Sequence, residues 1–540
     1  MNFQITIAGE AGQGIARSAE LVARDFASRG FYVFNYRDYG SLIRGGENFN
    51  LVRVGTEPVR SNNWKSDYAV VFGRFSAHHA KRLTPGGISL GTVPGVKVRV
   101  DVARVLRELK APQIVANSVL LGSLYRAMGQ PLEPLLEQME CFGKRAGINR
   151  KAAIRGYQDY KGPIRPVKLR GPKGSRYFVS GSQAVAFGAV AAGMDLYLAY
   201  PMTPATPVLH ILAGLDADIS VVQLENEIGV ANAALGASYA GASVMVGTSS
   251  GGYALMTETL SLQGMSELPL VLYLAMRPGP ATGVPTYTSQ GDLKFALYGG
   301  HGESPRVVVA PGDPLEAFER MAEAFYLANR YRTLSIVLSD KHLAESGFTF
   351  DKRPKFRVKP QRFLVSPGKG YRSYRMNASG VPPRAPAGSA LVRATSYEHD
   401  EFGYTVEGED AIDSMVENRL KKVRTIEKAV AALDPVRVFG RGRNLVVSWG
   451  STKGAVLDAL RHVDAKFLQL CYLRPFPSRR VKRLLEAADR VVLVENSATG
   501  QMADVIAEHT GFFIRDKILK YDGRPFGERE LATRLRRVFK

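Results

Sequence analysis

Short apolar runs that end in glycine, hydroxyl or charged residues recur along most of this chain. Their length and composition are typical of buried strands, and clear examples span residues 3–8, 31–34, 51–54, 68–72, 244–248, 270–276, 444–451 and 491–496. Between them lie amphipathic or alanine- and glycine-rich segments of helical composition, such as 15–29 and 228–241. Strands that alternate with helices predict several doubly wound α/β domains, in which ligands gather at the carboxyl ends of the strands.

We expect five parts, because two basic stretches that contain proline and glycine interrupt this alternation. The parts are a first α/β domain over residues 1–162, a basic linker over 163–176, a second α/β domain over 177–345, a connector over 346–440 and a third α/β domain over 441–540. The connector includes a charged helix over 411–432. A chain of 540 residues is long enough for about three to four domains with sizeable cores.

Part of the formal net charge of +22 lies in the two basic stretches. Residues 161–176 contain six basic and no acidic residues, and residues 352–375 contain nine basic and no acidic residues. Their prolines and glycines favour solvated linkers, with an electrostatic surface for an acidic protein partner as the alternative. No zinc-finger, RNP or helix-turn-helix signature accompanies the charge, so we expect no nucleic-acid partner.

The two cysteines, Cys141 and Cys471, are far apart and have no CxxC spacing. They cannot hold an iron–sulfur cluster, which takes about four thiolates, and we expect two buried free thiols rather than a disulfide. The sequence has no run of eighteen apolar residues and no basic start followed by an apolar signal region. We therefore expect a cytoplasmic chain without a membrane segment.

Residues 198–251 carry the densest candidate chemistry. Tyr200-Pro201-Met202-Thr203-Pro204 ends a short apolar strand, and its prolines restrict the backbone on both sides of Thr203. A second strand runs into Glu225, Asn226 and Glu227 at the start of a helix rich in alanine and glycine. From its position alone, Glu227 is either a helix-terminal charge satisfied by backbone amides or a functional acid.

Two further patterns have both a functional and a structural interpretation. Arg277 follows the strand 270–276, where its planar donors suit a carboxylate or a structural ion pair. Gly12-Gln13-Gly14 lies between a strand and a helix. Backbone amides at such a helix start can receive phosphate, although a tight turn and close packing explain the glycines equally well.

These motifs resemble the alpha subunit of 2-oxoacid:ferredoxin oxidoreductases. Residues 200–204 are similar to the family's Tyr-Pro-Ile-Thr-Pro motif, and 277–286 to its Arg-x-Gly-Pro-Ser-Thr-Gly-x-Pro-Thr segment, which Gln290-Gly291-Asp292 follows. Residues 398–403 and 520–526 match later landmarks of the same subunit. The departures are small, with Met202 in place of isoleucine and Ala281 in place of serine.

Other segments extend the resemblance across essentially the whole chain. Gly9 to Gly14 and the Ser-x-x-Arg-Gly-Gly element over 41–46 resemble the family's gamma module, so the order resembles a gamma module fused ahead of an alpha module. Glu227, followed by Gly236 in a small-residue helix, resembles the pyrimidine-binding domain of thiamine diphosphate enzymes. Residues 441–540 resemble the transketolase C-terminal domain.

The resemblance implies coenzyme A-dependent oxidative decarboxylation of a 2-oxoacid, such as 2-oxoglutarate or pyruvate, to acyl-CoA, carbon dioxide and reduced ferredoxin. One alternative is a paralogous thiamine-dependent oxidoreductase for aryl or branched-chain 2-oxoacids. Another is a non-catalytic subunit that binds coenzyme A or a nucleotide.

The resemblance also assigns roles to single residues. Glu227, Thr203 and Arg277 would be catalytic, and Glu227, Tyr200 and Pro201 would bind the cofactor. Arg277, Thr203 and Thr286 would bind the substrate. Coenzyme A or phosphate would be bound by Gly12, Gln13, Gly14 and Arg44. No metal ligand is expected in this chain.

One expected motif is missing. Thiamine diphosphate enzymes hold pyrophosphate and magnesium with Gly-Asp-Gly, but Gly291-Asp292 is followed by Leu293, and Gly312-Asp313 by Pro314. The cofactor and its magnesium would therefore be shared with a separate beta subunit, which would also carry the iron–sulfur cluster. We expect a heterodimer or heterotetramer that reduces ferredoxin and contacts no membrane.

Overall fold

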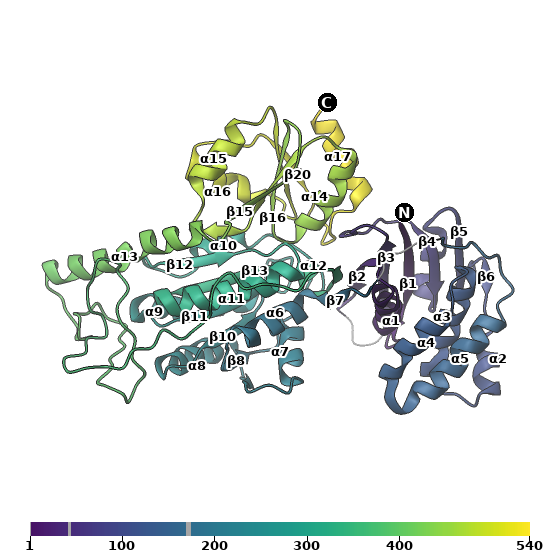
Figure 1. Ribbon diagram of the computed structural model, residues 1–540, viewed down its shortest axis with the longest axis horizontal. Coiled ribbons are helices and arrows are strands. Elements are labelled where there is room, and N and C mark those ends of the chain that lie inside the picture. The colour runs from purple at the N-terminus through teal and green to yellow at the C-terminus, as the bar shows by residue number, and fades with distance from the viewer. Residues whose placement is uncertain (1, 42–44, 169–173) are drawn as a thin grey trace. The chain divides into compact units, whose positions relative to one another are not determined.

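The computed structural model describes residues 2–41, 45–168 and 174–540. Two compact units form the chain (Figure 1). The first comprises Met1–Val179, Glu345–Arg353 and Phe526–Thr533, and the second comprises Ser180–Ala344, Pro354–Pro525 and Arg534–Lys540. Each unit is built on its own β-sheets, and the predicted α/β fold class is confirmed.

The first unit contains an eight-stranded mixed sheet in the order β6-β5-β4-β1-β3-β2-β14-β7. Its strands are β1 Asn2–Ala11, β2 Tyr32–Tyr39, β3 Gly45–Gly55, β4 Ser66–Val71, β5 Leu83–Gly91, β6 Val98–Arg99, β7 Tyr177–Ser180 and β14 Gly347–Phe350. Strands β1, β4, β5 and β6 run parallel, whereas β3 is antiparallel to both β1 and β2. The carboxyl ends of β1, β4 and β5 therefore meet at one edge of the sheet.

Helices bury many apolar residues of this sheet in a large core cluster, and a smaller cluster contains Ala69 and Val71 of β4. They are α1 Ile15–Ser28, α2 Val102–Glu108, α3 Ala116–Ala127, α4 Glu133–Gln138 and α5 Ala146–Gln158, with the 3-10 segments η1 Arg74–Lys81, η2 Gln113–Val115 and η3 Met139–Arg145. Gly122 and Gly156 let α3 and α5 approach closely, since a Cβ atom on either would lie 1.9 Å from a carbonyl oxygen of the other helix.

The second unit contains a seven-stranded sheet in the order β18-β12-β13-β11-β10-β8-β9. Its strands are β8 Leu196–Ala199, β9 Ser220–Gln223, β10 Val244–Thr248, β11 Leu270–Met276, β12 Arg306–Val309, β13 Leu334–Asp340 and β18 Tyr472–Arg474, the last of which is antiparallel to β12. All other pairs in the sheet are parallel. Strands β10 to β13 consist entirely of buried residues, as expected for a parallel sheet covered on both faces.

Helices cover both faces of this sheet. They are α6 Gly181–Ala191, α7 Thr206–Ala213, α8 Glu227–Tyr239, α9 Ser250–Ser266, α10 Leu293–Tyr298, α11 Pro314–Tyr331 and α12 Lys341–Glu345. Buried residues of α8, α9 and α10 belong to one apolar cluster, and those of α6, α7 and α11 belong to another.

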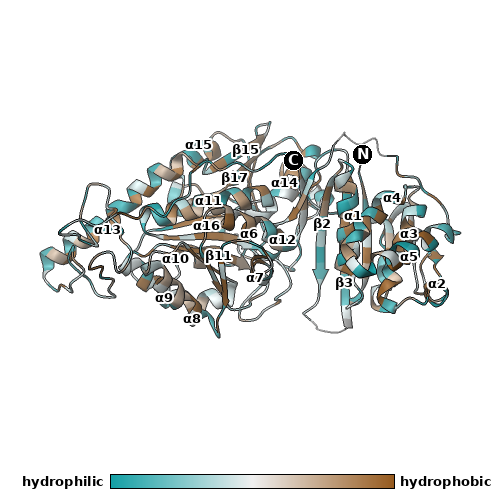
Figure 2. Ribbon diagram, turned by 60° about the horizontal axis from the view of Figure 1, so that its bottom comes forward, coloured by the Kyte–Doolittle hydropathy of each residue, from teal (hydrophilic) through white to brown (hydrophobic). Residues whose placement is uncertain are grey.

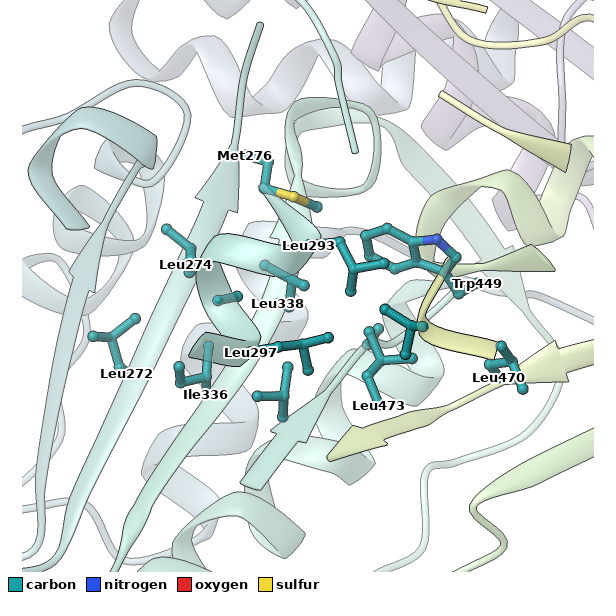
Figure 3. Packing of buried hydrophobic residues seen from close by; sticks show 14 of the residues in the cluster. Leu272, Leu274, Met276, Leu293, Leu297, Ile336, Leu338, Trp449, Leu470 and Leu473 are labelled. Atoms are coloured by element: carbon teal, nitrogen blue, oxygen red, sulfur yellow. The ribbon is translucent and has the colours of Figure 1, made fainter. Parts of the chain in front are cut away.

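A second sheet of this unit has the order β15-β17-β16-β19-β20. Its strands are β15 Val436–Gly440, β16 Leu445–Trp449, β17 Lys466–Leu470, β19 Val491–Glu495 and β20 Asp516–Leu519, accompanied by α14 Lys453–Ala459, η4 Gly450–Thr452, η5 Leu460–His462, α15 Ser478–Glu486 and α16 Gln501–Thr510. The last helix, α17 Glu528–Val538, has its first residues in the first unit and its last residues in the second. Figure 3 shows Trp449 beside Leu293 of α10, in a cluster that includes Leu274 of β11 and Leu470 of β17. The two sheets of the second unit therefore share one hydrophobic core.

A long segment without regular secondary structure precedes α13 Glu409–Ala431, which confirms the predicted charged helix. Hydrophobic and hydrophilic residues alternate along α13 (Figure 2), and its buried residues include Met415, Ile426 and Val430. Buried arginines anchor the segment. Arg384 donates to the carbonyl of Ser238, and Arg332 donates to that of Ser373. The division into five parts stays a prediction.

The prediction of two buried thiols is wrong for Cys141, which is exposed. Cys141 lies in η3, where Met139 is the one buried residue, so this short segment has little apolar surface to cover a thiol. Cys471 is buried, and burial raises the pKa of its thiol to about 12. No helix in the described ranges is long and apolar enough to cross a membrane.

Lys422 of α13 and Glu267, which follows α9, form a fully buried ion pair. Burial opposes the charged form of Glu267, but the charges of Lys422 and Arg332 outweigh it and lower the pKa of this carboxyl. We predict that Lys422→Met lowers the free energy of unfolding by about 3–5 kcal/mol, because a buried carboxylate loses its nearest counter-charge. Denaturant unfolding followed by circular dichroism measures the change.

Arg443→Met is the matched control, because the pair of Arg443 with Asp489 is exposed. Its loss should cost less than about 1 kcal/mol. Equal losses in the two variants would contradict a structural role for the buried pair.

Candidate functional site

The candidate site lies at the carboxyl edge of the seven-stranded sheet. From β8 the chain runs outward to β9 and then returns across β8 to β10, so the strand order reverses between β8 and β10. In open α/β sheets, ligands bind outside the carboxyl ends of the strands at such a reversal. The segments that leave this edge contain Thr203 after β8, Glu227 after β9, Ser249 after β10 and Arg277 after β11.

Glu227 occupies the first turn of α8 and is only 3% exposed. Asn226 caps this helix instead, since its side-chain oxygen accepts from the Gly229 N–H at 2.8 Å. The Oε1 atom of Glu227 is buried and accepts no hydrogen bond from the described residues. Glu225, by contrast, is exposed. The structure therefore does not support the interpretation of Glu227 as a capping charge.

The start of α9 packs directly against Glu227. A Cβ atom on Gly252 would lie 2.6 Å from Glu227 Oε1 and 2.2 Å from Thr248 Oγ1, so only glycine permits this approach. Ser249, which precedes α9, has a buried hydroxyl without a hydrogen-bond partner among the described residues. The predicted strand that ends in hydroxyl and glycine residues is confirmed as β10. Its last residue, Thr248, and Glu227 both pack against Gly252.

Arg277 follows β11 and is 7% exposed. Its Nη1 atom donates to the carbonyl oxygen of Thr203 at 2.9 Å, and its Nε atom is buried without a partner. Arg277 makes no ion pair within 4.0 Å in the described part of the chain, so the alternative of a structural ion pair is not observed. Burial lowers the pKa of its guanidinium, and the charges of Asp292 and Glu227 oppose this effect.

Asp292 joins this group, although the sequence analysis gave it no role. Burial raises the pKa of its carboxyl, while a hydrogen bond with Ser250 and the charge of Arg277 lower it by less. Its Oδ2 atom is buried and has no hydrogen-bond partner in the described chain. The one available signal was its place in the Gln290-Gly291-Asp292 segment that follows the arginine motif.

The remaining predicted residues are placed less closely. Thr203 presents its carbonyl to Arg277 rather than its hydroxyl. Thr286 is buried, with an unpartnered hydroxyl, whereas Tyr200 is exposed and Pro201 is half-buried. A hydrogen bond links Arg277 to Thr203, and electrostatic interactions link Arg277 to Glu227 and Asp292. No such interaction within the described chain links Thr286, Tyr200 or Pro201 to this group.

The first unit has a separate candidate site where β1 turns into α1. Gly12 and Gly14 adopt positive φ angles of 88° and 71°, which favour glycine. Gln13 closes the turn, since its side chain accepts from the Glu10 N–H at 2.8 Å and its carbonyl accepts from Asn117 Nδ2 at 2.6 Å.

Gly12 and Gln13 line a cavity of about 470 Å³, together with Phe72 after β4, Thr92 after β5 and residues of α2, η2 and α3. The predicted glycine turn before a helix is confirmed at the carboxyl edge of this sheet. Arg44 lies outside the described residues.

Two family models match the chain. The model for pyruvate flavodoxin/ferredoxin oxidoreductase, thiamine diphosphate-binding, matches residues 187–418, and the model for pyruvate ferredoxin/flavodoxin oxidoreductase matches residues 4–159. The first contains the Glu227 and Arg277 site, and the second contains the glycine turn.

Curated relatives and one solved structure extend the match to the full length. The alpha subunit of a Sulfolobus 2-oxoacid:ferredoxin oxidoreductase is 29% identical over 100% of this chain and 97% of its own. The KorA subunit of 2-oxoglutarate oxidoreductase from Mycobacterium tuberculosis is 31% identical over 86% of this chain and 73% of its own. The 2-oxoglutarate:ferredoxin oxidoreductase from Magnetococcus marinus, solved with 2-oxoglutarate, coenzyme A and succinyl-CoA bound, is 27% identical, covers 100% of both chains and has a TM-score of 0.90.

These matches confirm the resemblance inferred from the motifs and favour an oxidoreductase subunit over a non-catalytic binding subunit. The chain belongs to the 2-oxoacid:ferredoxin oxidoreductase family and is an alpha-type subunit of it.

Proposed function

We propose that this chain supplies the pyrimidine side of a thiamine diphosphate site, and the substrate arginine, in an enzyme that oxidises 2-oxoglutarate, pyruvate or both. The observation that carries the proposal is the buried Oε1 atom of Glu227, which has no hydrogen-bond partner in the described chain. A buried polar atom without a partner costs about 1–3 kcal/mol. Such a group requires an explanation, and a ligand that restores the missing bond supplies one at the carboxyl edge of the sheet.

The residues around Glu227 fit the cofactor. An aminopyrimidine ring offers nitrogen atoms that can share a proton with a carboxyl group, and the close approach of Gly252 keeps the Glu227 carboxyl buried. Thiamine diphosphate, when bound, supplies the carbanion chemistry of decarboxylation. Glu227 would hold and transfer a proton at the pyrimidine ring, as a general acid–base group, with Tyr200 and Pro201 beside the ring.

Arg277 is suited to bind the carboxylate of a 2-oxoacid. The Thr203 carbonyl holds one edge of the guanidinium through Nη1, which leaves the unpartnered Nε atom for a carboxylate oxygen. A planar guanidinium binds a carboxylate with two parallel hydrogen bonds, whereas a lysine acts as a point charge. The hydroxyl of Thr203 would bind the substrate carbonyl, and the buried Thr286 hydroxyl would close the other side of the carboxylate.

Coenzyme A would bind in the first unit, with a phosphate at the turn formed by Gly12, Gln13 and Gly14. Three features support this proposal: the cavity at the turn, the amino end of α1 and the coenzyme A in the Magnetococcus marinus relative. Arg44 stays a candidate from the sequence.

The chain requires a partner for the rest of the cofactor site. It lacks Gly-Asp-Gly, so a beta subunit would hold the pyrophosphate, its magnesium and the iron–sulfur cluster, in a cytoplasmic heterodimer or heterotetramer that reduces ferredoxin. A Cβ atom on Gly236 of α8 would meet nothing within 4 Å, which leaves room for a closely packed partner. Aryl or branched-chain 2-oxoacids remain the alternative substrates.

The purified chain alone should bind thiamine diphosphate weakly, even with Mg²⁺, and should show no iron–sulfur absorbance. The phosphate motif is missing, and two cysteines cannot supply the roughly four thiolates of a cluster. Calorimetric titration compares the single chain with the complex formed on co-expression with a subunit that carries Gly-Asp-Gly. Tight magnesium-dependent binding by the single chain would refute the shared site.

Glu227→Gln in the assembled complex should lower kcat by about 10²–10⁴-fold, because an amide cannot act as the general acid–base group. The two side chains are of similar volume, so folding and cofactor affinity should change little. Steady-state turnover and exchange of the cofactor's C2 proton are the measurements. Glu225→Gln is the control, and a larger loss in that variant would transfer the role to Glu225.

Arg277→Lys should lower kcat/KM by about 10–100-fold, which corresponds to about 1.5–3 kcal/mol for a lost charged hydrogen bond. The loss should be similar for pyruvate and 2-oxoglutarate, since both present the carboxylate beside the carbonyl. A loss confined to 2-oxoglutarate would instead place Arg277 at the distal carboxylate.

Arg306→Lys is the matched control. Arg306 is also 7% exposed, its Nη1 atom donates to a carbonyl, that of Gly299, and its Nε atom is unpartnered. It begins β12, however, and therefore lies at the opposite edge of the sheet. Its replacement should leave kcat/KM close to that of the wild type.

A further inference from the structure

Three potential metal ligands converge in the first unit, apart from the glycine turn. Glu47 lies in β3, and His78 and His79 are consecutive residues of η1. The Oε1 atom of Glu47 lies 2.8 Å from His79 Nε2 and 3.3 Å from His78 Nε2. The three ligand atoms all lie within 4.8 Å of one another, and the described residues contain no other group of this kind.

Glu47 Oε1 and the two imidazole nitrogens approach one another closely. His79 Nε2 lies 2.8 Å from Glu47 Oε1, a distance at which the imidazole and the carboxylate attract each other directly. Both atoms are buried. A cation that displaced this contact would have all three donor atoms as ligands.

The surroundings suit a bound ion on one side and solvent on the other. His79 is 3% exposed, and its ring lies 4.6 Å from that of Phe49, so packing fixes its orientation. His78 is exposed and makes a hydrogen bond with the Phe75 backbone, which orients its ring. Glu47 is half-buried between them. Packing therefore holds the His79 ring in place, and the exposure of His78 leaves coordination positions of the ion open to water.

We propose that Glu47, His78 and His79 bind a divalent transition-metal ion, for which Zn²⁺ is the best fit. Zinc is bound by imidazole nitrogens and carboxylate oxygens, and a set of two histidines and one glutamate leaves coordination positions open. Magnesium and calcium prefer oxygen ligands alone, so two imidazoles disfavour them. The sequence gave no sign of this site, because Glu47 is far from the histidines along the chain and no metal-binding spacing links them.

The ion would connect η1 to the sheet, because His78 and His79 belong to η1 and Glu47 belongs to β3. A hydrogen bond already links η1 to β1, since Ser76 Oγ donates to the Gly9 carbonyl at 3.0 Å. The metal would therefore stabilise the end of β1 that leads into the glycine turn. Arg82 carries a nearby positive charge that would repel the ion. Its charge contributes to lowering the pKa of both Glu47 and His78.

Titration of the full-length chain with Zn²⁺ tests the proposal. The chain is first treated with a chelator and then titrated by calorimetry, and elemental analysis measures the metal content of the dialysed sample. We expect one Zn²⁺ per chain. Glu47→Gln and His78→Ala should each weaken binding by more than tenfold, since even outer-shell changes cost about 10–100-fold. Arg82→Gln should strengthen it, because an opposing charge is removed.

His301→Ala is the control, because His301 is exposed and lies in the second unit; its binding should equal that of the wild type. Both ligand variants retain the buried His79 ring that packs on Phe49, and circular dichroism verifies their fold. Absence of Zn²⁺ binding by the wild-type chain would overturn the proposal. So would wild-type affinity and stoichiometry in both Glu47→Gln and His78→Ala.

Discussion

Burial of the seven-stranded sheet on both faces is the constraint on which the second unit depends. Strands β10 to β13 have no exposed residue, and one apolar cluster continues from this sheet through α10 to Trp449 and the five-stranded sheet. A strand covered on both faces consists mostly of apolar residues. The charged groups of the candidate site therefore gather where the strands end, and the reversal between β8 and β10 opens that edge.

The carboxyl edge holds several buried polar atoms that the described chain leaves without partners, including Glu227 Oε1, Ser249 Oγ, Arg277 Nε and Asp292 Oδ2. Each such atom costs stability, because burial removes its hydrogen bonds to water. Their concentration in one place is therefore better explained by binding than by folding. The proposed cofactor site is also incomplete in this chain, since the sequence lacks the Gly-Asp-Gly motif for pyrophosphate.

Much of the fold was predictable from local pattern. Apolar runs identified strands of both units, and glycine, proline and small-residue segments identified the turn before α1 and the helix that begins at Glu227. Family motifs placed Glu227, Thr203 and Arg277 in one site, and the structure brings these residues together. The exposure of Cys141 was not predictable, because it depends on whether other segments of the chain cover η3.

The α/β class, the family and the residue types of the site follow from the amino-acid sequence, because they depend on side-chain periodicity and short motifs. Which atoms meet depends on the folded chain. It gave Asn226 rather than Glu227 the capping role, turned the carbonyl of Thr203 toward Arg277, added Asp292 and brought Glu47 to His78 and His79. Such pairings depend on strand order and on the packing of segments distant in the chain, which a local pattern does not contain.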